Sequence, residues 1–405
     1  MSRIVAVIGD DGAAETTFFA LFAQLYGGKY SGGICSISGK RFCLFREPGL
    51  LSQTITQTDV NVLEGAIAIG HISSLANDLQ PITMETKSGK LAICGDCAPE
   101  WILRIIDYLK AAPKINQTVI VEWMKNNIGP WAFLIINKNR IYAFRGDGRK
   151  PLVFGRLDDQ GFIIASQENA IVTVGGTILR HLEPGEVASF DKGQIRTLFC
   201  DCDRSATVRC IREVVYTQSP AATWGGSLIQ NLRIATGRIL GELIDVKVDW
   251  VYPVQLGGNP FAQGIYEVLP RGTRFNPAGF TKVNYPRPEI VPIEAVCSLT
   301  DPQEIAGRNV LIVNDTLQSG GEIAYLAGLC RRAGAIRIHV AVACLALSNC
   351  PYGGEIPIDL MGQDKTNKEI AIALDVDSFV SLPLNDICRA ITTPRIVFCA
   401  ECLEE

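Results

Sequence analysis

A strand followed by a glycine-containing turn is the first feature of the sequence whose residue types could do chemistry. Val310 to Val313 is fully apolar, a polar segment from Asn314 to Ser319 follows it, and Gly320 and Gly321 precede a helical pattern. Glycines at a helix N-terminus let backbone N–H groups approach a phosphate closely, and the helix dipole adds favourable charge. The pattern predicts an anion-binding loop, with an ordinary strand-to-helix turn as the alternative.

Fourteen cysteines are the second such feature. The N-terminus has no basic region followed by an apolar core, so we expect a cytoplasmic chain whose thiols stay reduced or bind metal. Cys94 and Cys97 are separated by two residues, as metal ligands often are, and Cys35 and Cys43 could complete a site. No spacing rule joins these segments, so reduced thiols or a redox pair are the alternative.

The composition excludes several classes of function. The 405 residues are 47% hydrophobic and 20% charged, which suits two or three folded domains rather than a disordered chain. Thirty-eight Lys and Arg against 42 Asp and Glu give a net charge of -4, so no basic excess points to nucleic acid. The apolar runs are too short or too interrupted to cross a bilayer, and we expect no contact with a membrane.

The elements that must position these residues differ between the two halves of the chain. Residues 1 to about 200 contain short apolar segments separated by Gly, Asp and Asn turns, with helical patterns at Ala13 to Leu25 and Glu100 to Ala111. An α+β layered sandwich is predicted. The expected strands are Ile4 to Ile8, Ala66 to Ile69, Leu91 to Cys94, Ala132 to Ile136, Ile141 to Phe144 and Phe162 to Ala165.

Strands alternate with helices in the second half, which predicts a parallel sheet with crossover helices. The expected strands are Trp250 to Val254, Asn309 to Val313 and Ile336 to Leu345, and the expected helices are Gly226 to Leu243 and Gly320 to Ala333. Pro270 to Pro292 is rich in Pro, Gly and Arg, and we expect it to form a loop over the carboxyl edge of this sheet.

Several segments resemble, in the same order, the amidophosphoribosyltransferase family. The likeness extends from about residue 1 to Cys402, and the segment after Val310 is similar to the ribose-phosphate loop of type I phosphoribosyltransferases. The other matching segments are Ile67 to His71, Arg145 to Leu152, Ala165 to Glu168, Glu183 to Glu186 and Cys210 to Pro220. The resemblance implies a glutamine amidotransferase-like, four-layer α+β sandwich of the N-terminal-nucleophile type at residues 1–200. An α/β domain like the type I phosphoribosyltransferases would follow at residues 210–402.

The first half departs from the family where glutamine would be hydrolysed. The family's nucleophile is a cysteine at the start of the mature chain, where its own α-amino group acts as the base. Ser2 holds this position and would become the first residue if Met1 were removed, either as a serine nucleophile or as a terminus without a catalytic role. The family's carboxylate-binding arginine is replaced within Ile72 to Ser74, and its Asn-Gly oxyanion pair is replaced by Asp96 and Cys97. An aspartate would repel a developing oxyanion.

Two further contacts of the family are absent. The arginine beside the nucleophile is replaced at Tyr26 to Gly28, and the acid that binds the glutamine amino group is replaced at Gln117 to Val119. A charged substrate group without its partner binds poorly. We therefore predict that the chain has no glutaminase activity.

The second half keeps part of the family's phosphate site. The paired acids of the family correspond to Asn314 and Asp315, so one acid survives, whereas the pyrophosphate loop reads Gln255 to Gly258 without its acid and hydroxyl. Displacement of pyrophosphate with the help of magnesium needs those charges, so we expect neither the transfer reaction nor bound magnesium. A phosphate or nucleotide could still bind; the loop residues that would hold it besides Asn314 and Asp315 are Thr316, Ser319 and Gly320.

Four cysteines match, position by position, those that hold a 4Fe-4S cluster in some members of the family. They are Cys210, Cys350 in Cys350-Pro351-Tyr352-Gly353, and Cys399 and Cys402 near the C-terminus. A cubane cluster needs four thiolates, and a two-residue gap lets one turn of chain present two sulfurs to adjacent irons. Zinc on the same sulfurs or four structural thiols are the alternatives, and Cys200 or Cys202 could replace Cys210.

Two functional hypotheses follow. In the first, the chain is a family descendant without glutaminase or transferase activity that binds a 4Fe-4S cluster as a structural, redox or electron-relay subunit. In the second, it is an enzyme with an altered substrate that uses Ser2 or the Asn314-Asp315 loop. The family assembles into dimers and tetramers, so a homo-oligomer or a subunit of a larger complex is expected.

Overall fold

The computed structural model describes residues 2–26, 30–137, 140–157, 161–191, 193–201, 207–282, 297–352, 359–391 and 396–403. The chain divides into two units. The first contains Met1–Cys210, Tyr352–Glu355 and Arg395–Cys399, and the second contains Ile211–Pro351, Ile356–Pro394 and Ala400–Glu405. None of the helices in the described ranges combines the length and the apolar character that a membrane span requires.

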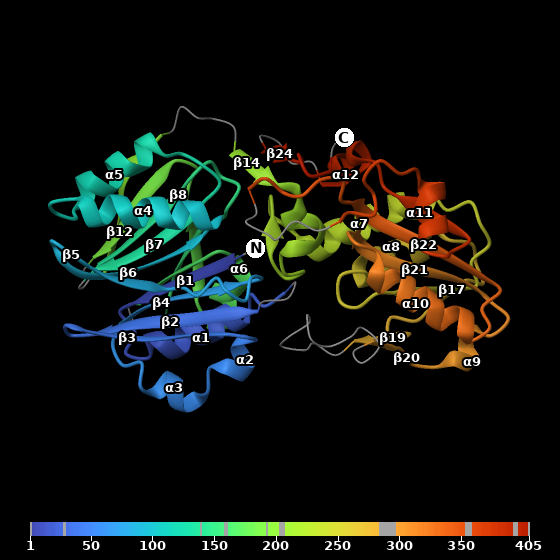
Figure 1. Ribbon diagram of the computed structural model, residues 1–405, viewed down its shortest axis with the longest axis horizontal. Coiled ribbons are helices and arrows are strands. Elements are labelled where there is room, and N and C mark those ends of the chain that lie inside the picture. Colours follow the sequence, from blue (N-terminus) through green and yellow to red (C-terminus); the bar gives the residue numbers. More distant parts are fainter. Residues whose placement is uncertain are drawn as a thin grey trace. The chain divides into compact units, whose positions relative to one another are not determined.

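Two antiparallel sheets form the centre of the first unit, and helices cover their outer faces (Figure 1). The seven-stranded sheet has the order β11 (Thr177–His181), β9 (Val153–Arg156), β10 (Phe162–Ala165), β1 (Ser2–Ile8), β4 (Ile67–Ser73), β2 (Ser31–Ser38), β3 (Arg41–Pro48). The six-stranded sheet has the order β13 (Gln194–Cys200), β12 (Glu186–Asp191), β8 (Arg140–Arg145), β7 (Ala132–Asn137), β6 (Gly89–Asp96), β5 (Ile82–Thr86). The predicted four-layer α+β sandwich is confirmed.

The layers of the first unit pack together because the apolar side chains of a strand point alternately to its two faces. Ile4 and Ala6 of β1 lie in the apolar core between the sheets, whereas Val5 and Val7 face the helices, because successive side chains of a strand point to opposite faces. The helices beside the seven-stranded sheet are α1 (Ala13–Phe22), α2 (Leu51–Thr54), α3 (Gln57–Asn61) and α6 (Glu168–Thr173). Those beside the six-stranded sheet are α4 (Pro99–Ala111) and α5 (Gln117–Asn126).

A parallel five-stranded sheet is the core of the second unit, as the alternation of strands and helices predicts. Its order is β18 (Arg274–Phe275), β17 (Trp250–Pro253), β21 (Asn309–Leu317), β22 (Arg337–Leu345), β23 (Ser378–Ser381). Apolar side chains of α9 (Pro302–Ile305), α10 (Gly321–Arg332) and α11 (Asn367–Ala373) pack into one buried cluster with β17, β21 and β22. The other helices that contact the sheet are α7 (Ile229–Glu242), α8 (Asn259–Val268) and α12 (Leu384–Ile391).

Short elements complete the described chain. In the first unit, β14 (Thr207–Cys210) forms a parallel ladder with β24 (Ile396–Cys399), so the end of the long N-terminal part pairs with a segment close to the C-terminus (Figure 1). In the second unit, β15 (Thr223–Trp224) pairs with β16 (Ser227–Leu228), β19 (Phe280–Lys282) pairs with β20 (Cys297–Leu299), and η1 (Glu213–Thr217) is a π-helical turn.

Some predicted boundaries are wrong. The strand expected to end at Val313 continues to Leu317, because its parallel pairing with β22 continues that far, so most of the predicted polar loop is strand. The helix expected to reach Leu25 ends at Phe22. Of the expected loop at 270–292, the described part contains β18 and β19. Met1, Cys202, Gly353, residues 27–28 and residues 283–292 lie outside the described residues.

Candidate functional site

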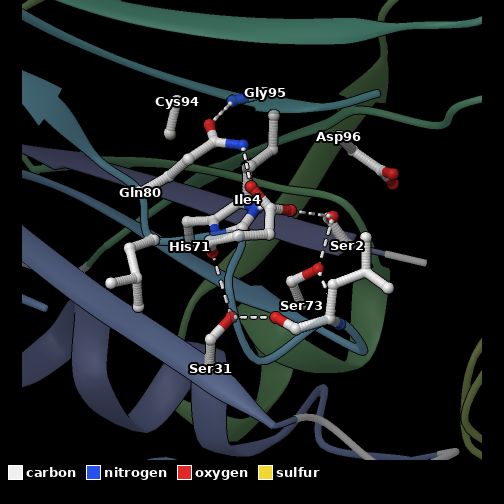
Figure 2. Close-up of polar contacts among 12 residues, drawn as sticks. Ser2, Ile4, Ser31, His71, Ser73, Gln80, Cys94, Gly95 and Asp96 are labelled. Carbon is white, nitrogen blue, oxygen red and sulfur yellow. Dashed lines mark hydrogen bonds and ion pairs between the residues drawn. The ribbon is translucent and has the colours of Figure 1, made fainter. Parts of the chain in front are cut away.

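Ser2 lies at the start of β1, buried among polar side chains (Figure 2). Its Oγ is 3.2 Å from Oγ of Ser73 and 3.2 Å from Oδ2 of Asp78. The register between β1 and β4 places Ser2 opposite Ser73, which explains the first contact. The Asp78 carboxylate also lies 3.5 Å from Nε2 of His71 and accepts a 2.8 Å hydrogen bond from Nε2 of Gln80. Ser2 therefore contacts a carboxylate and a hydroxyl, and its single proton can go to only one of them at a time.

Asp96, at the end of β6, is the centre of a buried ion-pair network. Its Oδ1 lies 3.0 Å from Nζ of Lys150, and its Oδ2 lies 3.4 Å from Nη1 of Arg3. All three side chains are buried. Burial by itself would raise the pKa of Asp96, but the charges of Lys150 and Arg3 together hold that pKa below its ordinary value. The carboxylate therefore stays ionised between two buried cations.

The predicted anion-binding segment spans the end of β21 and the start of α10. Gly320 precedes the helix with a φ of 80°, a conformation that favours glycine. Nδ2 of Asn314 donates a 3.1 Å hydrogen bond to the carbonyl of Thr316, so this side chain turns back to its own strand. Oγ1 of Thr316 is buried and has no hydrogen-bond partner within the described ranges, and Ser319 is exposed. The segment offers hydroxyl groups and a helix N-terminus to an anion.

Asp315, the acid that this segment retains, lies directly against the backbone of Gly257. A methyl group added to Gly257 would lie 1.7 Å from Oδ2 of Asp315. Burial raises the pKa of Asp315 to about 6, against the opposing effects of the Arg233 charge and the Thr316 backbone N–H. The carboxyl group is thus poorly hydrated and incompletely compensated by positive charge.

The substitution Asp315→Asn is expected to stabilise the protein at neutral pH and to have little effect near pH 4. The pKa of about 6 in the folded chain lies above the ordinary value of about 3.9. The folded state therefore holds this proton more tightly, and the free energy of unfolding falls as the pH rises through this range. After allowance for partial exposure, the gain is roughly 1–2 kcal/mol. Urea unfolding at the two pH values measures it, and an equal change at both would contradict the assignment.

The four candidate cysteine ligands lie at two places. Cys210 and Cys399 end β14 and β24 and are direct partners in that parallel ladder, which sets their backbones about 4.8 Å apart. At the second place, the carbonyl of Cys402 accepts a 3.2 Å hydrogen bond from the N–H of Ser348, two residues before Cys350. Cys402 is buried and the other three are half-buried.

Each unit contains two of these four ligands, Cys210 and Cys399 in the first and Cys350 and Cys402 in the second. Throughout the ranges that the structure describes, no set of three or more His, Cys, Asp or Glu side chains is arranged to hold a metal ion. The structure brings Cys210 to Cys399 and it brings Cys402 to the segment before Cys350. The four cysteines together are a soft, all-thiolate donor set, which suits an iron–sulfur cluster or a structural zinc ion.

Arg149 contacts one of the candidate ligands. Its guanidinium donates a hydrogen bond to the side chain of Cys399, forms an ion pair with Asp147, and lies 4.2 Å from the centre of the Tyr352 ring. Burial by itself would lower the pKa of Arg149, but the hydrogen bond to Cys399 and the charge of Asp147 raise it above its ordinary value. Cys399 thus has a permanent positive charge beside its sulfur.

The other cysteine pair lies in a different environment. Sγ of Cys94 is 3.6 Å from the carbonyl of Gly70, to which it donates. Burial raises the pKa of Cys35 to about 12 and raises the pKa values of Cys94 and Cys97 well above the ordinary value. Cys35 and Cys94 belong to the apolar cluster between the sheets, and Cys97 belongs to the cluster beside α4 and α5, which favours core thiols over a second metal site.

Reasoning from the sequence missed Asp78, the Lys150 and Arg3 partners of Asp96, and the contact between Arg149 and Cys399. These contacts join residues far apart in sequence, and no spacing pattern marks them. Lys150 and Arg149 do lie within the Arg145 to Leu152 match, which is the one signal that could have drawn attention to them.

Similarity to known proteins extends over almost the whole chain. The chain is 25% identical to an amidophosphoribosyltransferase of Methanocaldococcus jannaschii, over 93% of this chain and 91% of that protein. It is 24% identical to an amidophosphoribosyltransferase of Mycobacterium tuberculosis, over 98% of this chain and 84% of the relative. A solved structure of glutamine phosphoribosylpyrophosphate amidotransferase from B. subtilis, complexed with ADP and GMP, matches the fold with a TM-score of 0.87 at 20% identity, covering 99% of this chain and 96% of that one. No family model matches the chain.

Proposed function

Because the chain is a divergent member of the amidophosphoribosyltransferase family, we propose that it is a relative without the family's catalytic activity that binds a 4Fe-4S cluster. Residues 1–200 are assigned to the glutamine amidotransferase-like domain and residues 210–402 to the phosphoribosyltransferase-like domain. The proposed ligands are Cys210, Cys350, Cys399 and Cys402. The cluster would give the protein a structural, redox or electron-relay role within a homo-oligomer or a larger complex.

The pairing of Cys210 with Cys399 is the observation that carries the proposal. Two candidate ligands that are far apart in the sequence end neighbouring strands at the same position, which is how separate segments can supply sulfurs to one cluster. The guanidinium of Arg149 donates a hydrogen bond to the Cys399 side chain, so one proposed ligand has a cation beside its sulfur. When bound, the cluster supplies one-electron chemistry.

The surroundings of Ser2 support the loss of glutaminase activity. The position where the family has its carboxylate-binding arginine is held by a segment that includes Ser73, whose hydroxyl accepts from Ser2. The carboxylate of Asp78 lies next to it and would repel the carboxylate of glutamine. Asp96 stands where the family has its oxyanion donor, and a carboxylate that Lys150 and Arg3 keep ionised has no proton to donate to an oxyanion. The substrate carboxylate therefore meets a like charge, and the oxyanion lacks its donor.

The segment at the start of α10 supports the proposal that the second domain binds a phosphate group but does not catalyse the transfer reaction. Thr316, Ser319 and Gly320 could hold a phosphate or a nucleotide, with the buried Oγ1 of Thr316 as an available donor. Asn314 bonds to its own strand, and Asp315 lies against Gly257. Neither arrangement supplies the pair of ionised acids that would hold magnesium on a ribose, so binding without transfer is proposed.

The variant Ser2→Cys, which restores the family's nucleophile, is expected to release no more ammonia from glutamine than Ser2→Ala does. A nucleophile without the substrate's charge partners and the oxyanion donor does not hold glutamine in a reactive geometry. Ammonia release by wild type, Ser2→Cys and Ser2→Ala is measured with and without phosphoribosyl pyrophosphate.

Pyrophosphate release in the same samples tests the second domain. The proposal expects neither product from any of the three proteins. Ammonia from wild type above the Ser2→Ala level would favour the competing hypothesis of an enzyme that uses Ser2, and pyrophosphate would favour an enzyme that uses the Asn314-Asp315 loop.

A further inference from the structure

Cys210 and Cys399 are paired with each other in the parallel ladder of β14 and β24, within the first unit. Each is the last residue of its strand, and each ends a stretch of chain that belongs to that unit. Residues paired in a ladder carry their side chains on the same face, because successive side chains of a strand alternate between its two faces. The two cysteine side chains therefore leave the same face of the ladder.

The spacing of this ladder is compatible with a disulfide bond. Neighbouring strands lie about 4.8 Å apart, and the Cα atoms of a disulfide lie roughly 4.4–6.8 Å apart. The pairing of residues 207–209 with residues 396–398 holds the two strand ends in register. Both cysteines carry free thiols in the structure, so the reduced form already has the arrangement that the bond needs.

The other cysteines on described strands face residues of other types in their ladders. These pairs are Cys35 with Leu44, Cys43 with Ser36, Cys94 with Leu134, Cys200 with Glu186, Cys297 with Lys282 and Cys344 with Thr316. Cys35 and Cys94 are also buried in the apolar cluster between the sheets, whereas Cys210 and Cys399 are half-buried and can be reached by a small oxidant. Geometry and exposure together favour Cys210 and Cys399.

A cation lies beside one of these two sulfurs. The guanidinium of Arg149 donates a hydrogen bond to the side chain of Cys399. A partly exposed cysteine beside an arginine is typical of thiols that react with oxidants. The surroundings of Cys399 therefore suit thiol–disulfide exchange.

We propose that Cys210 and Cys399 form a reversible disulfide bond when the protein meets a small-molecule disulfide such as glutathione disulfide. One cysteine, as its thiolate, attacks the oxidant, forms a mixed disulfide and releases one glutathione. The other cysteine then attacks the protein sulfur of the mixed disulfide and releases the second glutathione. Two electrons pass from the cysteines to the oxidant, and the protons of the two thiols end on the two glutathione products.

The disulfide would change both the connectivity of the chain and its capacity for metal. It would close a covalent loop that contains residues 211–398, which include most of the second unit. Metal ligation requires thiolates, so the oxidised chain would lose two of the four proposed cluster ligands. The inference itself rests on the ladder of β14 and β24 and does not need the cluster.

Cross-link mapping of the full chain tests the inference. Wild type is freed of metal with bathophenanthroline disulfonate and EDTA, reduced with dithiothreitol, desalted, incubated with glutathione disulfide, and quenched with an alkylating agent. A faster band is expected in non-reducing electrophoresis, because a closed loop of this size makes the denatured chain more compact. Dithiothreitol should remove the band, and mass spectrometry of a protease digest should find Cys210 joined to Cys399.

Three serine variants complete the test. Cys210→Ser and Cys399→Ser should each lose the faster band, whereas Cys43→Ser, which changes another half-buried strand cysteine, should keep it. A wild-type digest in which these two cysteines carry only glutathione, stay reduced, or are joined to other cysteines overturns the inference. The wild-type digest decides by itself, so the test holds even if a serine variant fails to fold.

The outcome is separate from that of the cluster proposal. Iron and sulfide analysis of untreated protein tests the cluster, and the digest of metal-free protein tests the disulfide. Wild type that contains iron but forms no cross-link overturns the disulfide alone. Wild type that forms the cross-link but contains no iron overturns the cluster alone and supports the disulfide.

Discussion

Replacement of Cys399 by serine should remove most of the iron from anaerobically purified protein, from about four atoms per chain to less than about one. Serine has nearly the same size as cysteine, but its hydroxyl is a poor ligand for iron. Cys399 is half-buried and ends β24 opposite Cys210, so the substitution leaves the strand pairing in place. Because cluster ligation is coupled to folding, the melting temperature should fall together with the iron content.

Cys43→Ser is the matched control for this prediction. Cys43 is also a half-buried cysteine on a strand, β3, which pairs with β2 and is not part of the ladder of β14 and β24. Its iron content should equal that of wild type. Cys402→Ser should behave like Cys399→Ser, and full iron content in both ligand variants would contradict the ligand assignment.

The substitution Asp96→Asn should lower the free energy of unfolding by roughly 3–5 kcal/mol. The side chain keeps its shape but loses the charge that compensates Lys150 and Arg3, which are both buried. Breaking a buried ion pair from one side leaves an uncompensated charge, which costs more than the pair contributes. Chemical unfolding followed by tryptophan fluorescence measures the loss.

Asp107→Asn is the control for Asp96→Asn, because Asp107 lies on the exposed part of α4 and should change stability by no more than about 0.5 kcal/mol. The pH dependence gives a second check. Because the folded pKa of Asp96 lies below its ordinary value, its stabilising contribution is present above about pH 4 and is lost as the pH falls through the folded pKa. A difference between wild type and Asp96→Asn that persisted unchanged in acid would contradict the network.

Elements with a strong local pattern were predictable from the sequence. The apolar run Phe162–Ala165 is a strand with the predicted bounds, since both of its neighbours bury it. Helix α8 was missed because Gly264 weakens its local pattern. A methyl group at Gly264 would lie 2.1 Å from the carbonyl of Ile234, so the glycine is required by the close approach of α7, which sequence alone does not reveal.

The candidate site was predictable only where the family resemblance supplied the positions. The resemblance named Cys210 and Cys399, and the ladder that pairs them was not readable from either segment. The sequence showed that Asp96 replaces the oxyanion donor. It did not show that Asp96 pairs with Lys150 and Arg3, because these two cations come from other segments. Local patterns specify elements, whereas these contacts depend on how distant strands and loops pack.

Native mass spectrometry of the anaerobically purified chain tests the central claim most directly, because it counts metal and sulfide together in the folded protein. The account predicts a mass above that of the polypeptide by four irons and four sulfides, which Cys399→Ser loses and Cys43→Ser keeps. A chain that carries a single zinc ion, or no inorganic mass at all, would contradict it.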